Sequence, residues 1–158
     1  LAHLSPVDIE ENATRCARRH GSESPGSAAA ETARVSAAMI LADTSVWIDH
    51  LRRSGSPLAA LLDRDEVLSH PFVLGELACG TLKTRGVTLR LLQTLQMVPL
   101  AEHNEVLALI EQNDLMGTGI GWIDAHLLGS TLLAGALLWT LDAPLARAAA
   151  KLSVLARP

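Results

Sequence analysis

The sequence is poor in cysteine and in aromatic residues. Its two cysteines, Cys16 and Cys79, lie far apart and form no Cys-x-x-Cys motif, which excludes a disulfide framework and a cysteine-based zinc site. An aromatic content of 3%, with no Tyr, is too low for the rows of stacking residues that OB-fold and RRM-like proteins offer to single-stranded nucleic acid. We therefore expect a protein of a reducing compartment, the cytoplasm, in which Cys79 is a small apolar residue.

Long apolar runs and an excess of basic charge are also missing. The longest uncharged apolar stretch, residues 132–141, is far shorter than the ~20 residues of a membrane span. The first thirty residues lack the basic start and apolar block that are typical of an export signal. A net charge of −4 gives no bulk basic field for nucleic acid. We expect a soluble protein that is not exported.

The sequence does contain enough apolar residues for a folded core. Its 158 residues, of which 49% are apolar and 19% charged, fit one domain with a short appendage. Residues 1–38 are small and polar without an apolar period, and we expect them to form an N-terminal extension that is flexible or partly helical. A dense apolar pattern begins at Met39, a candidate natural start, so the predicted domain spans residues 39–158.

Within this domain, short apolar runs alternate with longer segments of helical period, which is typical of α/β folds with a parallel sheet covered on both faces. Strands are predicted at 39–42, 66–70, 97–100, 136–141 and 153–156. Helices are predicted at 44–53, 56–65, 71–83, 87–96, 101–115, 122–134 and 143–152. In the helix over 101–115, we expect Val106, Leu107 and Ile110 to face the core.

Two acidic residues directly follow predicted strands. Asp43 comes after the strand at 39–42, and Asp142 comes after the strand at 136–141. In open parallel sheets, ligands bind outside the carboxyl ends of the strands, so these two side chains are candidates for one site. The alternative for each is a purely structural role as the cap of the helix that follows.

Two further acids, Glu76 and Asp124, stand among apolar neighbours, where each would occupy or border a buried helix face. Burying an ionised carboxylate without a partner costs roughly several kcal/mol or more. The nearest basic residues to Glu76 are Lys83 and Arg85, and none lies within ten positions of Asp124. Pairing with an arginine is one solution. A divalent cation is the other, and ligands that are all oxygen favour Mg²⁺ or Mn²⁺ over zinc.

These acids fall within four segments that carry a family resemblance, namely ILADTSVWIDHL (40–51), LGELACG (74–80), GIGWIDAHLLGS (119–130) and LLWTLDAPLARAA (137–149). In this order they resemble the PIN-domain ribonucleases, specifically the VapC-type toxins of bacterial toxin–antitoxin pairs, over about residues 39–158. The resemblance implies a three-layer α/β/α domain with a central parallel sheet. It also implies an endoribonuclease that uses Mg²⁺ or Mn²⁺ and an activated water on RNA, a VapB-type antitoxin as partner, and a homodimer.

The same resemblance assigns roles to individual residues. It makes four acids both metal ligands and catalytic residues, namely Asp43, Glu76, Asp124 and Asp142. It makes three hydroxyl residues supports of these acids or of the phosphate, namely Thr44, Ser45 and Thr140. The N-terminal extension departs from the family pattern, since such toxins begin near the position of Met39.

The remaining polar and aromatic residues of these segments have open roles. Candidate RNA contacts are Arg52, Arg53, Lys83, Arg85 and Arg90, for which solvated helix ends are the alternative. We interpret His126 as an ordinary, partly buried histidine rather than a general base. We interpret Trp47, Trp122 and Trp139 as core residues.

Two other functions compete with the nuclease. A haloacid-dehalogenase-like phosphatase needs a second acid two positions after the first, where this chain has Ser45, and a receiver domain needs paired acids and a late lysine. A non-catalytic PIN-like binding module is the other rival, with exposed apolar positions in 47–62 as its partner surface. A module that only binds has no need of the four acids.

Overall fold

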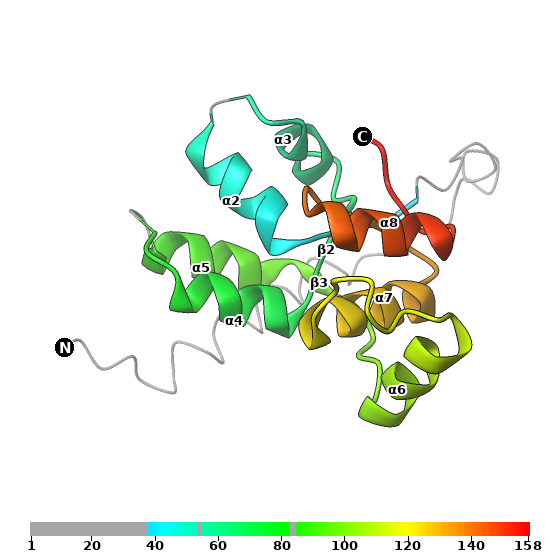
Figure 1. The fold of residues 1–158 in the computed structure, drawn as a ribbon. Helices are drawn as coiled ribbons and strands as arrows, with labels where there is room; N and C mark the ends of the chain where they lie inside the picture. The colour runs from blue at the N-terminus through cyan, green and yellow to red at the C-terminus, as the bar shows by residue number, and fades with distance from the viewer. Residues whose placement is uncertain (1–37, 54, 83–84) are drawn as a thin grey trace, which may run out of the picture. The chain divides into compact units, whose positions relative to one another are not determined.

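The computed structural model describes residues 38–53, 55–82 and 85–158 (Figure 1). The predicted N-terminal extension lies outside the described residues, apart from Ala38. The strands are β1 (Ile40–Ala42), β2 (Val67–Ser69), β3 (Gln96–Met97) and β4 (Leu137–Trp139). The helices are α2 (Thr44–Arg52), α3 (Pro57–Leu62), α4 (Pro71–Cys79), α5 (Arg85–Thr94), α6 (His103–Gln112), α7 (Trp122–Ala134) and α8 (Ala143–Lys151).

The strands form one parallel sheet in the order β3-β2-β1-β4. Ile40 of β1 pairs with Val67 on one side and with Leu137 on the other. Helices lie on both faces of this sheet, so the predicted three-layer α/β/α architecture is confirmed (Figure 1). Because all strands run the same way, their carboxyl ends open at one edge, where α2, α4 and α8 begin.

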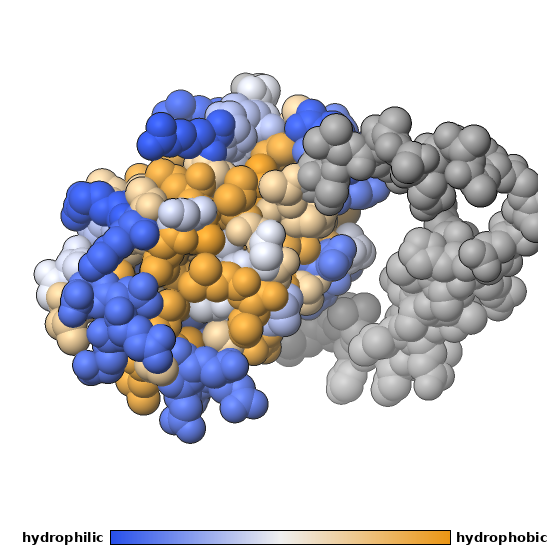
Figure 2. Space-filling view, turned by 90° about the vertical axis from the view of Figure 1, so that its right-hand side faces the viewer, coloured by the Kyte–Doolittle hydropathy of each residue, from blue (hydrophilic) through white to orange (hydrophobic). Residues whose placement is uncertain are grey.

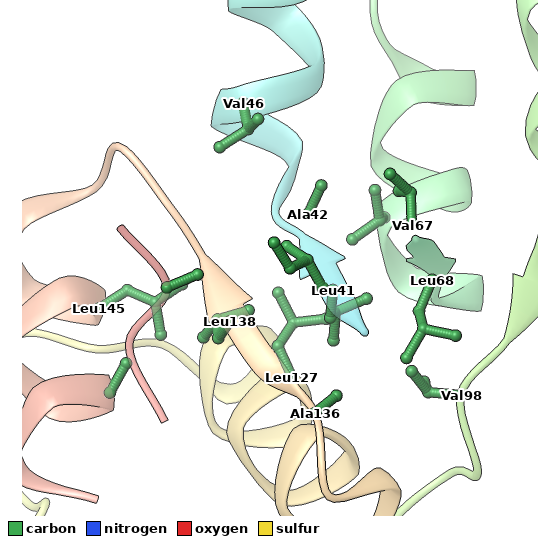
Figure 3. Close-up of a cluster of buried hydrophobic side chains, with 14 of the residues drawn as sticks. Leu41, Ala42, Val46, Val67, Leu68, Val98, Leu127, Ala136, Leu138 and Leu145 are labelled. Carbon is green, nitrogen blue, oxygen red and sulfur yellow. The ribbon is translucent and has the colours of Figure 1, made fainter. Parts of the chain in front are cut away.

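The core lies between the sheet and its covering helices. Leu41 of β1 and Leu138 of β4 are fully buried, and Leu127 of α7 points at both of them (Figure 3). On α2, Val46 is buried near the end of β1. Burial of each such side chain contributes about 1.5–3 kcal/mol, which explains why the short strands are continuous apolar runs.

A buried polar network ties α4 to α7. His70 Nδ1 accepts the Phe72 N–H at 3.0 Å as the N-cap of α4, so the neutral ring carries its proton on Nε2. That nitrogen lies 3.2 Å from Ser130 Oγ, which also accepts the Ala101 N–H at 3.1 Å. Burial, together with the nearby His126, lowers the pKa of His70 to about 4. His70 is therefore neutral and structural at neutral pH.

The edges of the fold differ from the sequence predictions. Strand β3 is shorter than the predicted strand at 97–100, because Pro99 has no N–H to donate to a neighbouring strand. The predicted strand at 153–156 makes a single bridge, Leu138 to Leu155. Leu107 is 52% exposed, so its predicted inward orientation is wrong. Cys79 is exposed at the end of α4, so it does not pack as an apolar core residue.

The surface of the described chain includes several exposed apolar side chains. The view in Figure 2 faces the side of α6, α7 and α8 and shows an apolar area bordered by hydrophilic residues. Exposed leucines of α6 and α7 are Leu107, Leu132 and Leu133. None of the helices among the described residues combines the length and the apolar character needed to cross a membrane.

Candidate active site

Asp43 is the most buried of the four predicted acids, with 6% of its surface exposed. It follows β1, where its N–H donates to Trp139 O of β4 at 2.9 Å, and it is the N-cap of α2. Its Oδ1 accepts the Thr44 N–H at 2.6 Å. Its Oδ2 accepts the hydroxyls of Ser45 at 2.6 Å and Thr140 at 2.8 Å. These donors satisfy the buried oxygens and orient the carboxylate.

The hydroxyls of Ser45 and Thr140 join the ends of β1 and β4. Besides donating to Asp43, each accepts a backbone N–H from the segment after β4. Ser45 Oγ accepts the Leu141 N–H at 3.0 Å, and Thr140 Oγ1 accepts the Asp142 N–H at 3.0 Å. A hydroxyl has one donor hydrogen and two acceptor lone pairs, so both side chains serve in both roles. Asp142 is thereby linked to Asp43 through one hydroxyl.

Glu76 is exposed on α4, so it does not lie within the buried face of that helix. Helix α4 buries Val73 and Leu77, and Glu76, three positions after Val73, stands at the edge of that face. Its Oε2 accepts the Thr44 hydroxyl at 2.5 Å, which connects α4 to the first turn of α2. Glu76 therefore joins the site from the solvent side, and the cost of burying a charge does not apply to it.

Asp124 and Asp142 lie at the N-termini of two helices. Asp142 is the exposed N-cap of α8, and its Oδ1 accepts the Leu145 N–H at 2.9 Å. Asp124, half-buried in the first turn of α7, accepts the Gly121 N–H at Oδ2 at 2.8 Å. The helix dipole favours a negative charge at both positions. Each carboxylate is thus fixed through one of its two oxygens.

Charge links the four acids to one another. Burial raises the pKa of Asp124 above its ordinary value, and the hydrogen bond from Gly121 opposes this rise. The negative charges of Asp43, Asp142 and Glu76 raise the pKa of Asp124 further. One carboxylate acts on another in this way only over a short range. Acids that follow β1 and β4 and that lie on α4 and at the start of α7 are therefore near enough for their charges to interact.

The chemistry of these donors fits a divalent cation. Three carboxylate oxygens, Glu76 Oε1, Asp124 Oδ1 and Asp142 Oδ2, have no hydrogen-bond partner within the described chain. Ion pairs among the described residues involve other acids, so neither Lys nor Arg neutralises this set. As the described side chains stand, no three acids, His or Cys are close enough to share an ion. Binding a hard cation therefore requires the exposed carboxylates to rotate towards it.

A cleft of about 490 Å³ lies beside Glu76. It is formed by α2, α4 and the chain between α4 and α5, and its lining residues are Ile48, Leu51, Arg52, Glu76, Leu77, Gly80, Thr81, Leu82 and Thr88. Arg52 is the predicted RNA contact that shares this cleft with an acid. Its guanidinium brings a positive charge to the edge of the acidic site.

Of the other predicted RNA contacts, two have local partners, one lies outside the described residues, and Arg90 is exposed on α5. Arg53 pairs with Asp49 at 2.9 Å in the next turn of α2. Arg85 donates to Ala78 O at 3.0 and 2.8 Å, which satisfies a carbonyl near the end of α4. Lys83 is outside the described residues. Arg52 is thus the predicted basic residue that lines the cleft beside Glu76.

Sequence reasoning missed a cluster of rings between the start of α7 and α6. Trp122, interpreted as core, is 43% exposed at the start of α7, so that prediction is wrong. Its indole contacts the rings of His126 and His103 at centroid distances of 4.6 and 5.6 Å. His126 is buried, in keeping with a structural histidine, and its Nε2 lies 3.2 Å from His103 Nδ1. Because Trp122 stands next to apolar residues such as Ile123 in the sequence, the sequence pattern wrongly predicts that it is buried.

Comparison with known proteins agrees with this geometry. The family profile described as PIN domain matches residues 40–151. The chain is 50% identical over 117 residues to "Ribonuclease VapC32" of Mycobacterium tuberculosis strain CDC 1551 / Oshkosh, a match that covers 73% of this chain and 94% of the relative. The protein of the same name from M. tuberculosis strain ATCC 25618 / H37Rv matches with the same identity and coverage.

Proposed function

This chain belongs to the PIN-domain family, and on that premise we propose that it is a metal-dependent endoribonuclease, the toxin of a toxin–antitoxin pair. The name of its mycobacterial relatives, Ribonuclease VapC32, supports RNA as the substrate. The catalytic domain is residues 39–158, which include the matched range, and the protein acts in the cytoplasm.

The observation that carries this proposal is the placement of four acids from separate parts of the sequence around one parallel sheet. Asp43 and Asp142 directly follow β1 and β4, Glu76 accepts the Thr44 hydroxyl next to Asp43, and Asp124 lies in the first turn of α7, where the charges of the other three raise its pKa. Such an arrangement costs free energy unless a cation is bound between the acids. A binding module has no need to maintain this repulsion, and a nuclease uses it to hold a metal.

The four acids would hold Mg²⁺ or Mn²⁺. When bound, the ion supplies Lewis-acid stabilisation of phosphate charge and makes water more acidic. Asp43 provides a fixed carboxylate, because its hydroxyl and amide donors hold it in place. Glu76 and Asp142, both exposed, adjust to the ion from the solvent side. Arg52, in the cleft beside Glu76, binds a phosphate of the RNA.

RNA cleavage by the purified full chain tests the proposal. We expect cutting with Mg²⁺ or Mn²⁺ and none with EDTA. We expect Glu76→Gln and Asp124→Asn to lower the rate by about 100-fold or more, since changes next to metal ligands alone cost 10–100-fold. Asp63→Asn removes an exposed acid at the end of α3 and serves as the matched control with unchanged activity.

Activity that persists in EDTA, or in both site variants, contradicts the metal mechanism. Circular dichroism of each variant separates loss of chemistry from loss of fold. Glu76→Gln is informative here because Glu76 is exposed, so its substitution leaves the core intact.

An apolar pocket of about 120 Å³ supports a protein partner, which we propose is a VapB-type antitoxin. It lies among α2, α3 and α5 and is lined by Trp47, His50, Leu51, Leu62, Thr88, Leu91, Leu92 and Leu95. At its rim, Leu91 is 63% exposed. Buried Trp47 Nε1 and His50 Nδ1 have no hydrogen-bond partner in the described chain, so a partner that opens this pocket and reaches them would satisfy two polar groups.

Co-purification with the antitoxin tests this surface. We expect Leu91→Asp to abolish the complex while the free variant still cleaves RNA. An unchanged complex with Leu91→Asp would show that the antitoxin binds another face of the protein.

A homodimer is the second proposed assembly, supported by the exposed leucines of α6 and α7, namely Leu107, Leu132 and Leu133. Leu133→Asp, examined by sedimentation equilibrium, is expected to yield a monomer.

A further inference from the structure

Trp122 differs from the other two tryptophans in its exposure. Trp47 is 4% exposed in the core and Trp139 is half-buried in β4, whereas Trp122 exposes 43% of its surface. Trp122 opens α7, two residues before Asp124. A large apolar ring is therefore presented to solvent within the same helical turn as a candidate catalytic acid.

The indole of Trp122 is held by its neighbours. His126, one turn along α7, contacts it edge to face with an interplanar angle of 84°, and His103 of α6 contacts it from a second helix. His126 is 3% exposed, hydrogen-bonds to His103 and to the Ala101 backbone, and packs against Phe72 of α4 at 5.1 Å. An indole fixed in this way loses little conformational freedom when a ligand stacks on it.

Base stacking would also provide binding energy at a site whose negative charge repels RNA. The acids repel the phosphates of RNA, Arg53 and Arg85 have local partners, and Arg52 lies in the cleft beside Glu76 rather than on α7. Contact between a nucleobase and an indole does not depend on opposite charge. An aromatic face in the first turn of α7, the turn that also carries Asp124, therefore adds affinity where Coulomb attraction is weak.

We propose that Trp122 is a base-stacking residue, whose exposed indole binds one unpaired nucleobase of single-stranded RNA next to the bond that the acids cleave. This inference rests on the proposed nuclease function for its substrate. It assigns the ring cluster of Trp122, His126 and His103 to substrate positioning and predicts a preference for single strands, because a paired base cannot reach the indole.

Binding of a short fluorescein-labelled oligouridylate to the full chain in EDTA tests the proposal without cleavage. We expect Trp122→Ala to weaken binding by about fivefold or more and Trp122→Phe to restore most of it. Val87→Ala, which truncates an exposed apolar residue of α5, is the matched control and leaves binding unchanged. An abasic oligonucleotide of equal length should bind wild type and Trp122→Ala alike.

Tryptophan fluorescence gives a second readout. Because Trp122 is the most exposed of the three tryptophans, oligouridylate should quench wild-type emission and leave Trp122→Phe nearly unquenched. Equal affinity of Trp122→Ala and wild type for the oligonucleotide overturns the proposal. So does a variant that loses only self-association in sedimentation, which would make Trp122 a contact between copies of the chain.

The outcomes also separate this inference from the nuclease proposal. If binding depends on Trp122 but no cleavage occurs with Mg²⁺ or Mn²⁺, the stacking role stands and the nuclease fails. If wild type cleaves RNA and Trp122→Ala has the same kcat/KM, the nuclease stands and the stacking role fails.

Discussion

The Thr140 hydroxyl donates a 2.8 Å hydrogen bond to Oδ2 of Asp43, joining residues that are 97 positions apart. The same oxygen atom of Thr140 accepts the N–H of Asp142. One side chain at the end of β4 thus fixes a buried acid of β1 and the backbone of an exposed acid of α8. Relationships of this kind hold the candidate site together before any ion is bound.

Thr140→Val tests that relationship with little change in shape. The variant leaves Asp43 one donor short and the Asp142 N–H without its acceptor. We expect the free energy of unfolding to fall by about 1–3 kcal/mol, measured by urea titration, and RNA cleavage to fall with it. Thr94→Val removes an exposed hydroxyl that bonds only to a helix carbonyl, and it is the control. Equal effects of both variants would contradict the special role of Thr140.

The raised pKa of Asp124 predicts how pH acts on the metal-free protein. The folded state keeps a proton on Asp124 at pH values where the unfolded chain has lost it. Stability therefore falls as pH rises from the ordinary value of 3.8 through the raised pKa. Glu76→Gln removes one neighbouring charge and should lower the pKa of Asp124, followed by carboxyl carbon NMR. An unchanged Asp124 titration in that variant would place Glu76 outside the acidic site.

A bound divalent cation should offset the repulsion among the four carboxylates of the candidate site. A divalent ion at 100 times its Kd stabilises the folded state by about 2.7 kcal/mol, so Mn²⁺ should raise the melting temperature in differential scanning fluorimetry. The increase should shrink on acidification, because protonated Asp124 does not ligate. The double variant Glu76→Gln, Asp124→Asn should show no increase. The same shift in wild type and double variant would assign the ion to another site.

His70 predicts a second pH dependence, of opposite sign. Its folded pKa of about 4 lies below the ordinary 6.5, so the unfolded chain binds the extra proton between these values. Stability is complete above pH 6.5 and falls on acidification towards pH 4, by about 3 kcal/mol in all. His70→Asn keeps an N-cap acceptor and should flatten this part of the profile in urea titrations. An unaltered slope would assign the acid sensitivity to other groups.

Gly129 marks a close approach of α7 to the segment before α6. A Cβ at Gly129 would lie 2.9 Å from Ala101 Cβ, which has no flexible atoms to move aside. We expect Gly129→Ala to destabilise the protein by about 1–3 kcal/mol. Gly75→Ala in α4, where nothing lies within 4 Å of the added Cβ, should instead stabilise by about 0.5–1 kcal/mol. Thermal unfolding of the pair measures the difference directly.

The sequence located Asp43 and Asp142 because each directly follows a buried strand, and parallel strands share an edge. The positions of β1, β2 and β4 followed from their apolar runs for the same reason. The apolar neighbours of Glu76 allow either a place within the buried face of α4 or one at its edge, and the structure places Glu76 at the exposed edge, three positions after buried Val73.

Other features depend on tertiary contacts that periodicity does not encode. Trp122 sits among apolar residues, yet it opens a helix at the mouth of the site and stays exposed. Leu107 has the spacing of an inward residue, but α6 covers the core with Val106 instead. The contact between His103 and His126 joins two helices. The two residues are 23 positions apart, so the spacing of apolar residues within one helix does not predict it.

The loop between α6 and α7 divides the candidate site into halves. Asp43 and Glu76 precede this loop, and Asp124 and Asp142 follow it. A break in the chain there would leave each fragment with two of the four proposed metal ligands, so activity would require the two pieces to reassociate through the β1–β4 pairing. This fold therefore suits a split enzyme. Each fragment expressed alone would be inactive, and RNA cleavage would appear only when both fragments associate in the same cell.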